Sequence, residues 1–106
     1  MGEFVFVYVT CSSVDEARRI AETVVEERLA ACANIYSSIE SIYWWRGRVE
    51  HSGEAALILK TRRILFSRLV KRIRELHSYE LPCIIALPII DGLPPFLKWI
   101  EDETKG

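Results

Sequence analysis

The feature that most constrains the fold of this 106-residue chain is a repeated switch in the spacing of its apolar residues. Residues 4–11 are almost all β-branched or aromatic, which predicts a strand with both faces covered. In residues 13–29, apolar side chains recur at three- and four-residue spacing, which predicts an amphipathic helix. From residue 33 to residue 45 the period becomes two, which predicts a second strand.

The second half of the chain repeats this order. Residues 46–47 supply a turn, and a strand follows from residue 48 toward residue 60. Thr61 is expected to open a second helix, which ends near His77 because Pro82 forces the residue before it into extended backbone. A short apolar strand and a terminal helix complete the chain, and we expect them at residues 83–90 and 96–103.

Two strand–helix–strand units joined by a hairpin predict one α+β domain over residues 1–106. Both crossovers are expected to be right-handed, which gives a ferredoxin-like βαββαβ sandwich with the strand order 4-1-3-2. Its sheet is antiparallel, its two helices lie on one face, and its central hairpin is long. A C-terminal helix is added at the end.

Charge and composition narrow the range of partners. A formal net charge of −1 gives no general attraction to nucleic acid or to an anionic membrane. No apolar run approaches the roughly 20 residues that a membrane span needs, and residues 1–3 lack the basic segment of a signal peptide. Three widely spaced cysteines without a Cys-x-x-Cys pair indicate a reducing compartment. We therefore expect a cytoplasmic protein that binds neither nucleic acid nor membrane.

The central hairpin indicates assembly. At about 3.3 Å per residue, residues 33–45 span on the order of 40 Å, whereas the first helix, of about 16 residues, covers only about 24 Å. The hairpin must therefore overhang the helices, and its end carries Tyr43, Trp44 and Trp45. Uncovered aromatic side chains on a ribbon are an aggregation hazard, so partner chains are expected to cover them. The alternative is that the terminal helix folds back over them.

One group of residues suggests metal chemistry. Cys11 ends the first strand, just before a helix that Ser13 and Glu16 open as a capping box, where the helix dipole favours a thiolate. The topology brings His77 and Cys83 to the same edge of the sheet as Cys11. Two thiols and an imidazole suit Cu(I) or Zn(II). The alternative is that the cysteines are ordinary buried residues and that His77 caps the second helix.

Several motifs in order resemble the CutA family of divalent-cation tolerance proteins over residues 4–100. The motifs are Glu27-Arg28-Leu29-Ala30-Ala31-Cys32-Ala33-Asn34, Ser41-Ile42-Tyr43-Trp44-Trp45 with Gly47, Lys60-Thr61, His77 with Tyr79 and Pro82, and Leu97 with Trp99. The resemblance implies a homotrimer related in architecture to the PII signalling proteins, in which long hairpins lock three subunits together. It also implies a cytoplasmic protein linked to tolerance of copper and other divalent metals, with no established reaction.

Three classes of function remain open at this point. The first is a trimeric metal-binding protein of metal homeostasis, with copper or another divalent metal as its cofactor at Cys11, His77 and Cys83. The second is a PII-like sensor that binds a small molecule in its intersubunit clefts, and the third is a scaffold that contributes assembly alone. No catalytic residues are predicted, so an enzyme is not expected. The residues expected at the trimer interface or cleft are Tyr43, Trp44, Trp45, Lys60, Tyr79 and Trp99.

Overall fold

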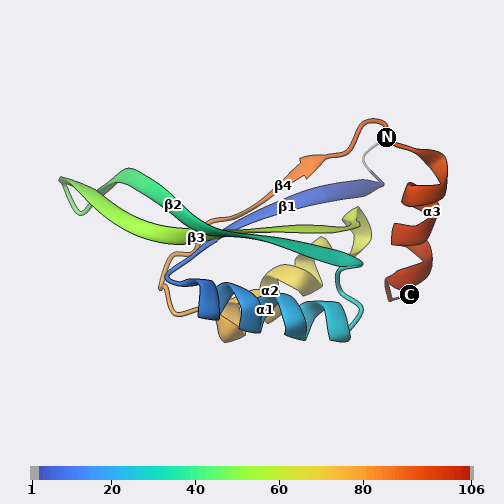
Figure 1. Ribbon diagram of the computed structural model, residues 1–106, viewed down its shortest axis with the longest axis horizontal. Coiled ribbons are helices and arrows are strands. Elements are labelled where there is room, and N and C mark those ends of the chain that lie inside the picture. The colour runs from blue at the N-terminus through green and yellow to red at the C-terminus, as the bar shows by residue number, and fades with distance from the viewer. Residues whose placement is uncertain (1–2, 106) are drawn as a thin grey trace.

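A computed structural model describes residues 3–105 of the chain (Figure 1). Strands and helices follow one another in the predicted order, with a short 3₁₀ helix, η1, added before the second helix. The elements are β1 (Phe4–Cys11), α1 (Val14–Glu26), β2 (Cys32–Trp45), β3 (Arg48–Arg62), η1 (Arg63–Leu65), α2 (Phe66–Leu76), β4 (Ile84–Pro88) and α3 (Pro94–Glu103).

The four strands form one sheet in the order β2-β3-β1-β4, and each neighbouring pair is antiparallel. This is the predicted 4-1-3-2 order, so the ferredoxin-like α+β fold is confirmed. Helices α1 and α2 lie side by side on one face of the sheet, while α3 stands at the end of the sheet that is opposite the hairpin tip (Figure 1). None of the helices in residues 3–105 is long and apolar enough to cross a membrane.

Strand β1 shows how the core is built, because its side chains alternate between the two faces of the sheet. Val5, Val7, Val9 and Cys11 are buried, whereas the residues between them are only half-buried. The buried set faces α1 and α2, where apolar side chains at helical spacing meet it. The largest fully buried side chains of this core include Ile20, Val24, Leu57, Leu59, Leu69 and Ile73.

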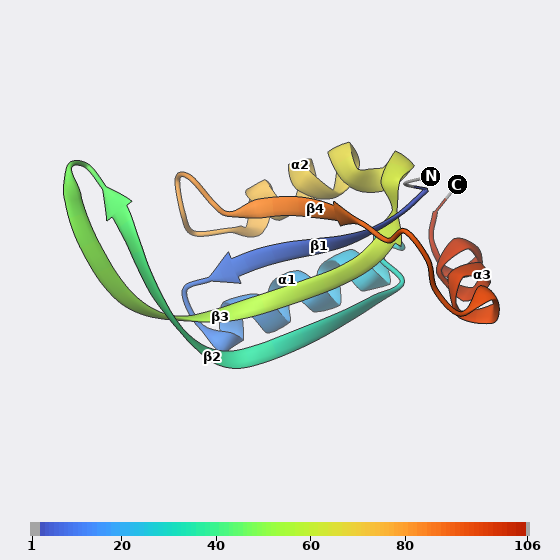
Figure 2. The same cartoon turned by 90° about the horizontal axis from the view of Figure 1, so that it is seen from above.

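The β2–β3 hairpin extends well beyond both helices, as Figures 1 and 2 show. Its turn places Arg46 and Gly47 at φ values of 51° and 80°, the left-handed region that a tight hairpin turn requires. A register shift between Tyr36 and Ile39 interrupts the ladder, and a bulge of this kind bends the strand. The predicted overhang is therefore confirmed, and the molecule reaches 44 Å along its longest axis.

Contrary to the prediction from the sequence, Thr61 does not open the second helix. Strand β3 keeps pairing with β1 as far as Arg62, which lies opposite Phe4. The Thr61 side chain is fully buried, and its hydroxyl donates a hydrogen bond to the Leu29 carbonyl at 2.7 Å. Helix α2 begins only at Phe66, after η1. Pairing with β1 and burial thus outweigh the tendency of threonine to cap a helix.

Candidate functional site

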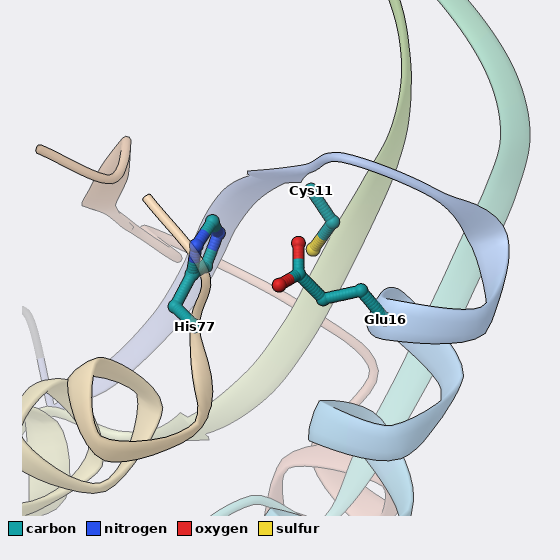
Figure 3. Close-up of side chains that lie close together, drawn as sticks. All are labelled: Cys11, Glu16 and His77. Atoms are coloured by element: carbon teal, nitrogen blue, oxygen red, sulfur yellow. The ribbon is translucent and has the colours of Figure 1, made fainter. Parts of the chain in front are cut away.

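Three buried side chains converge beneath the end of β1 (Figure 3). They are Cys11, the last residue of β1, Glu16, in the first turn of α1, and His77, the residue that follows α2. One ligand atom from each lies within 4.8 Å of the other two. A thiol, a carboxylate and an imidazole in one buried group are the donor types of a transition-metal site.

Glu16 takes its place from the way that α1 begins. The Ser13 hydroxyl caps the helix by accepting the Glu16 backbone N–H at 3.1 Å. The Glu16 carboxylate reaches back, and its Oε1 accepts the Ser12 backbone N–H at 2.8 Å and the Ser12 hydroxyl at 2.9 Å. Its Oε2 accepts the backbone N–H of Ser78 at 2.8 Å. The carboxylate thus joins the start of α1 to the loop after α2.

The same hydrogen bonds keep Glu16 ionised. Burial alone would raise the pKa of this carboxyl, but the donors from Ser12 and Ser78 outweigh it and lower the pKa to about 2. At neutral pH the group therefore contains a buried negative charge that three short hydrogen bonds satisfy.

His77 is held at both ring nitrogens. Its Nε2 lies 2.8 Å from the Thr10 carbonyl oxygen, which only accepts, so Nε2 carries the proton. Its Nδ1 accepts the Tyr79 backbone N–H at 3.1 Å. The imidazole is therefore the neutral tautomer that is protonated on Nε2, and it ties β1 to the α2–β4 loop.

Cys11 carries a protonated thiol. Burial, followed by the nearby carboxylates of Glu16 and Glu54, raises its pKa from 9.0 to about 12. The expectation that the helix start lowers this pKa is therefore wrong. The thiol is fully buried and lies beside a carboxylate, and these two effects exceed that of the helix dipole.

Cys83, the third predicted metal ligand, is not a member of this group among the described residues. Val9 pairs with Ile84, and continuing that register puts Cys83 opposite Thr10, so its side chain belongs to the other face of the sheet. There Cys83 lines a cavity together with Thr10. Burial raises its pKa, against the opposing effect of a hydrogen bond with Thr10.

The cavity on that side has a volume of about 620 Å³ and lies between the hairpin and the α2–β4 loop. It contains four of the six residues expected at an interface or cleft. Its lining consists of Thr10, Ser41, Tyr43, Trp44, Trp45, Glu54, Ser78, Tyr79, Glu80, Leu81 and Cys83.

The other two expected residues, Lys60 and Trp99, lie away from this cavity. The Lys60 ammonium donates a hydrogen bond to Asn34 at 2.7 Å and lies 6.0 Å from the ring centroid of Phe96. The Trp99 ring packs on that of Phe96 with 5.4 Å between centroids, and it lines a separate cavity of about 410 Å³ beside Arg28.

Two interactions shape the walls of the larger cavity. The Tyr79 hydroxyl donates to Oε2 of Glu54 at 2.6 Å, and burial together with this carboxylate raises the pKa of Tyr79. At the rim, Arg46 forms an ion pair with Glu80 at 3.0 Å, and its guanidinium lies 5.2 Å from the centroid of the Trp45 ring. These contacts connect the end of the hairpin to the α2–β4 loop.

Fold and site together define an α+β protein with a four-stranded antiparallel sheet, an overhanging hairpin and a buried Cys–Glu–His group. Comparison with known proteins makes this class specific. The chain belongs to the CutA1 divalent ion tolerance protein family, which it matches over residues 5–103.

Individual relatives agree with this assignment. A divalent-cation tolerance protein CutA of Archaeoglobus fulgidus is 45% identical over 100 residues, which cover 94% of this chain and 97% of the relative. Protein CutA of Mus musculus is 41% identical over 93% of the chain, but the match spans only 56% of the mouse protein. A structure described as the periplasmic divalent cation tolerance protein CutA from Archaeoglobus fulgidus superimposes with a TM-score of 0.93 at 43% identity, and the match covers 96% of this chain and 99% of that one.

Proposed function

We propose that this chain acts in divalent-cation tolerance by binding the metal ion itself, as a cytoplasmic homotrimer without enzymatic activity. The observation that carries the proposal is the convergence of Cys11, Glu16 and His77 within 4.8 Å. Thiolate and imidazole donors select copper-type and zinc ions over Mg(II), which prefers oxygen ligands alone. Copper is therefore the proposed physiological ion, and Zn(II) is its redox-silent probe.

Metal binding requires this group to rearrange. Donor atoms that surround an ion at about 2.0–2.3 Å lie about 3.5 Å apart, so a group whose donor atoms lie within 4.8 Å of one another must contract by up to about 1.3 Å. His77 must exchange one of its two hydrogen bonds for the ion, and Cys11 must lose its proton. Because one thiol proton is released, the apparent affinity should rise by up to about tenfold for each pH unit.

Calorimetric titration of the reduced protein with Zn(II) tests this proposal. We expect a saturable isotherm with one ion per chain, much weaker binding in Cys11→Ser, and unchanged binding in Cys32→Ser. Cys32 is a suitable control because it is also a free cysteine but lies at the start of β2, outside the group. Equal isotherms for the wild type and Cys11→Ser would refute the site.

Exposed apolar surface supports the proposed trimer. Trp44 is 74% exposed and Ile42 is 62% exposed, both on the overhanging hairpin. Apolar side chains also remain exposed on β4, where Ile85 and Leu87 alternate. Burial of apolar surface contributes about 25 cal/mol per Å² to stability. Subunits that bury these side chains against one another are therefore more stable in the assembly than as single chains.

Light scattering tests the assembly. A trimer of 12.2 kDa chains should remain intact at micromolar concentration, and a folded species with the mass of one chain would refute it. A mass of two chains would retain assembly but reject three-fold association.

The compartment is a separate part of the proposal. Cys11, Cys32 and Cys83 are all free thiols, which suits a reducing cytoplasm. The Archaeoglobus fulgidus structure is described as periplasmic. Cell fractionation therefore decides between the two compartments.

A second candidate function is that of a sensor for a small molecule. The cavity of about 620 Å³ favours it, because ligand sites commonly enclose about 300–1,000 Å³ and combine aromatic walls with a few polar groups. The cavity lies at the hairpin that the proposed trimer would use. Binding of a ligand there would therefore depend on the state of assembly. Thermal-shift screening of the reduced protein would find such a ligand.

A further inference from the structure

The cavity between the hairpin and the α2–β4 loop is formed by one chain. Residues 41–45 contribute one wall and residues 78–83 contribute the other, while Thr10 and Glu54 come from the sheet. The hairpin end bends toward the β4 edge of the sheet, where that loop also lies (Figure 2), and the ion pair between Arg46 and Glu80 links the two segments. Each chain therefore carries a complete set of these lining residues.

Four of the eleven residues that line this cavity are aromatic. Tyr43, Trp44, Trp45 and Tyr79 all line it. The faces of such rings carry partial negative charge and attract cations. One ring at the rim already does so, since the Arg46 guanidinium lies 5.2 Å from the centroid of the Trp45 ring.

The charged groups of the lining are acidic. Glu54 and Glu80 line the cavity, and no Lys or Arg does so within residues 3–105. Arg46 neutralises Glu80 through the ion pair at 3.0 Å. Glu54 has no such partner in the described part of the chain, and the Tyr79 hydroxyl orients its carboxylate through a hydrogen bond of 2.6 Å. A carboxylate without an ion-pair partner in the described part of the chain thus shares the cavity with four aromatic side chains.

We propose that this cavity binds a small organic cation of the alkylammonium class, with the ammonium group between the aromatic rings and the Glu54 carboxylate. This inference deepens the second candidate function by naming the class of ligand. Aromatic faces and a carboxylate act on the same positive charge, and the methyl groups of an alkylammonium pack against the rings. The volume of about 620 Å³ accommodates such a molecule.

Other ligands fit these groups less well. A hard divalent ion requires several oxygen ligands, whereas one unpaired carboxylate is present. Glu54 would repel a phosphate or another anion. A neutral apolar molecule would contact the rings but would bury the Glu54 charge without compensation, which is costly.

A pair of isosteric probes tests the proposal on the wild-type protein. Choline and 3,3-dimethylbutan-1-ol have the same shape, but only choline is charged. Titrations followed by tryptophan fluorescence and calorimetry should show choline binding about tenfold or more tightly than the neutral alcohol, a ratio expected for cation–π and ion-pair attraction. Equal affinities, or no saturable binding of choline, would overturn the proposal.

A matched pair of variants locates the charge that is responsible. Glu54→Gln retains an acceptor for the Tyr79 hydroxyl and should abolish the preference for choline. Glu50→Gln removes the same charge from the same strand, about 13 Å away at 3.3 Å per residue, and should preserve the preference. Loss of the preference in both variants would show that the net negative charge of the protein, and not the Glu54 carboxylate, attracts choline. That result would also overturn the proposed site.

The experiment separates this inference from the main proposal. Light scattering and Zn(II) titration are run on the same samples. Absence of choline binding in a trimer that binds zinc would refute the ligand class alone. This outcome includes the case in which a basic side chain of another subunit fills the cavity. Binding of choline by a protein that neither assembles nor binds zinc would leave this inference standing while the main proposal fails.

Discussion

Replacing Glu16 by Gln should destabilise the metal-free protein in a strongly pH-dependent way. The amide nitrogen of Gln has to face either the donors of Ser12 or the backbone N–H of Ser78, so at least one buried donor loses its acceptor. The charge is also lost. A carboxyl whose pKa falls from 4.5 to about 2 on folding contributes about 3 kcal/mol at neutral pH, at about 1.4 kcal/mol for each pH unit between the two values.

The sign of the pH effect follows from the direction of the shift. Because the pKa of Glu16 is lowered in the folded protein, its contribution is complete above about pH 5 and declines as the pH falls toward 2. At pH 3 about 1.4 kcal/mol of the charge-dependent part should remain, by the same linkage relation. The difference in unfolding free energy between the wild type and Glu16→Gln should therefore narrow by about 2 kcal/mol between pH 7 and pH 3.

Urea denaturation in the presence of a chelator, at fixed protein concentration, measures this difference. Asp15→Asn is the matched control, because Asp15 lies in the same helical turn but its side chain is 87% exposed and, within residues 3–105, forms an ion pair with Arg18 alone. This control should change stability by less than about 1 kcal/mol. A difference for Glu16→Gln that is below about 1 kcal/mol, or that is the same at both pH values, would refute the reasoning.

Three further outcomes are expected. Thr61→Val, which leaves the Leu29 carbonyl without its buried donor, should cost about 1–3 kcal/mol of unfolding free energy in urea titrations; a neutral result would show that water replaces the hydroxyl. Trp44→Ala should weaken the trimer far more than Trp45→Ala, because Trp44 is 74% exposed in the single chain and is therefore available to a partner subunit. Dilution followed by light scattering measures the dissociation of the trimer, and equal effects of the two variants would show that the interface lies elsewhere. Zn(II) affinity should fall on acidification between pH 8 and pH 6, whereas a constant affinity would exclude release of the Cys11 proton.

Local patterns were sufficient to predict most of the fold. The run of β-branched and aromatic residues in β1 and the helical spacing in α1 and α2 each identify the type of element without reference to distant residues. The overhang of the hairpin follows from chain dimensions alone. Thr61 was misassigned because its strand pairing and its hydrogen bond to Leu29 depend on contacts that its neighbours in sequence do not reveal.

The candidate site was predictable only in part. Topology placed Cys11 and His77 at one edge, and the structure brings them together. Cys83 lies at that edge too, but its position opposite Thr10 directs its side chain to the other face of the sheet. A shift of the strand pairing by one residue would reverse this direction, and the sequence of so short a strand does not determine the pairing. Glu16 was identified only as part of a capping box, since its second partner, Ser78, is 62 positions away in sequence.

Cobalt titration of the reduced protein tests the central claim most directly, namely that Cys11, Glu16 and His77 bind a divalent ion. Coordination by a thiolate gives Co(II) a sulfur-to-metal charge-transfer absorption that oxygen and nitrogen ligands do not produce. The band should saturate at one ion per chain, disappear in Cys11→Ser, and persist in both Cys32→Ser and Cys83→Ser. A band that survives in Cys11→Ser, or disappears in Cys83→Ser instead, would contradict this assignment of the metal ligands.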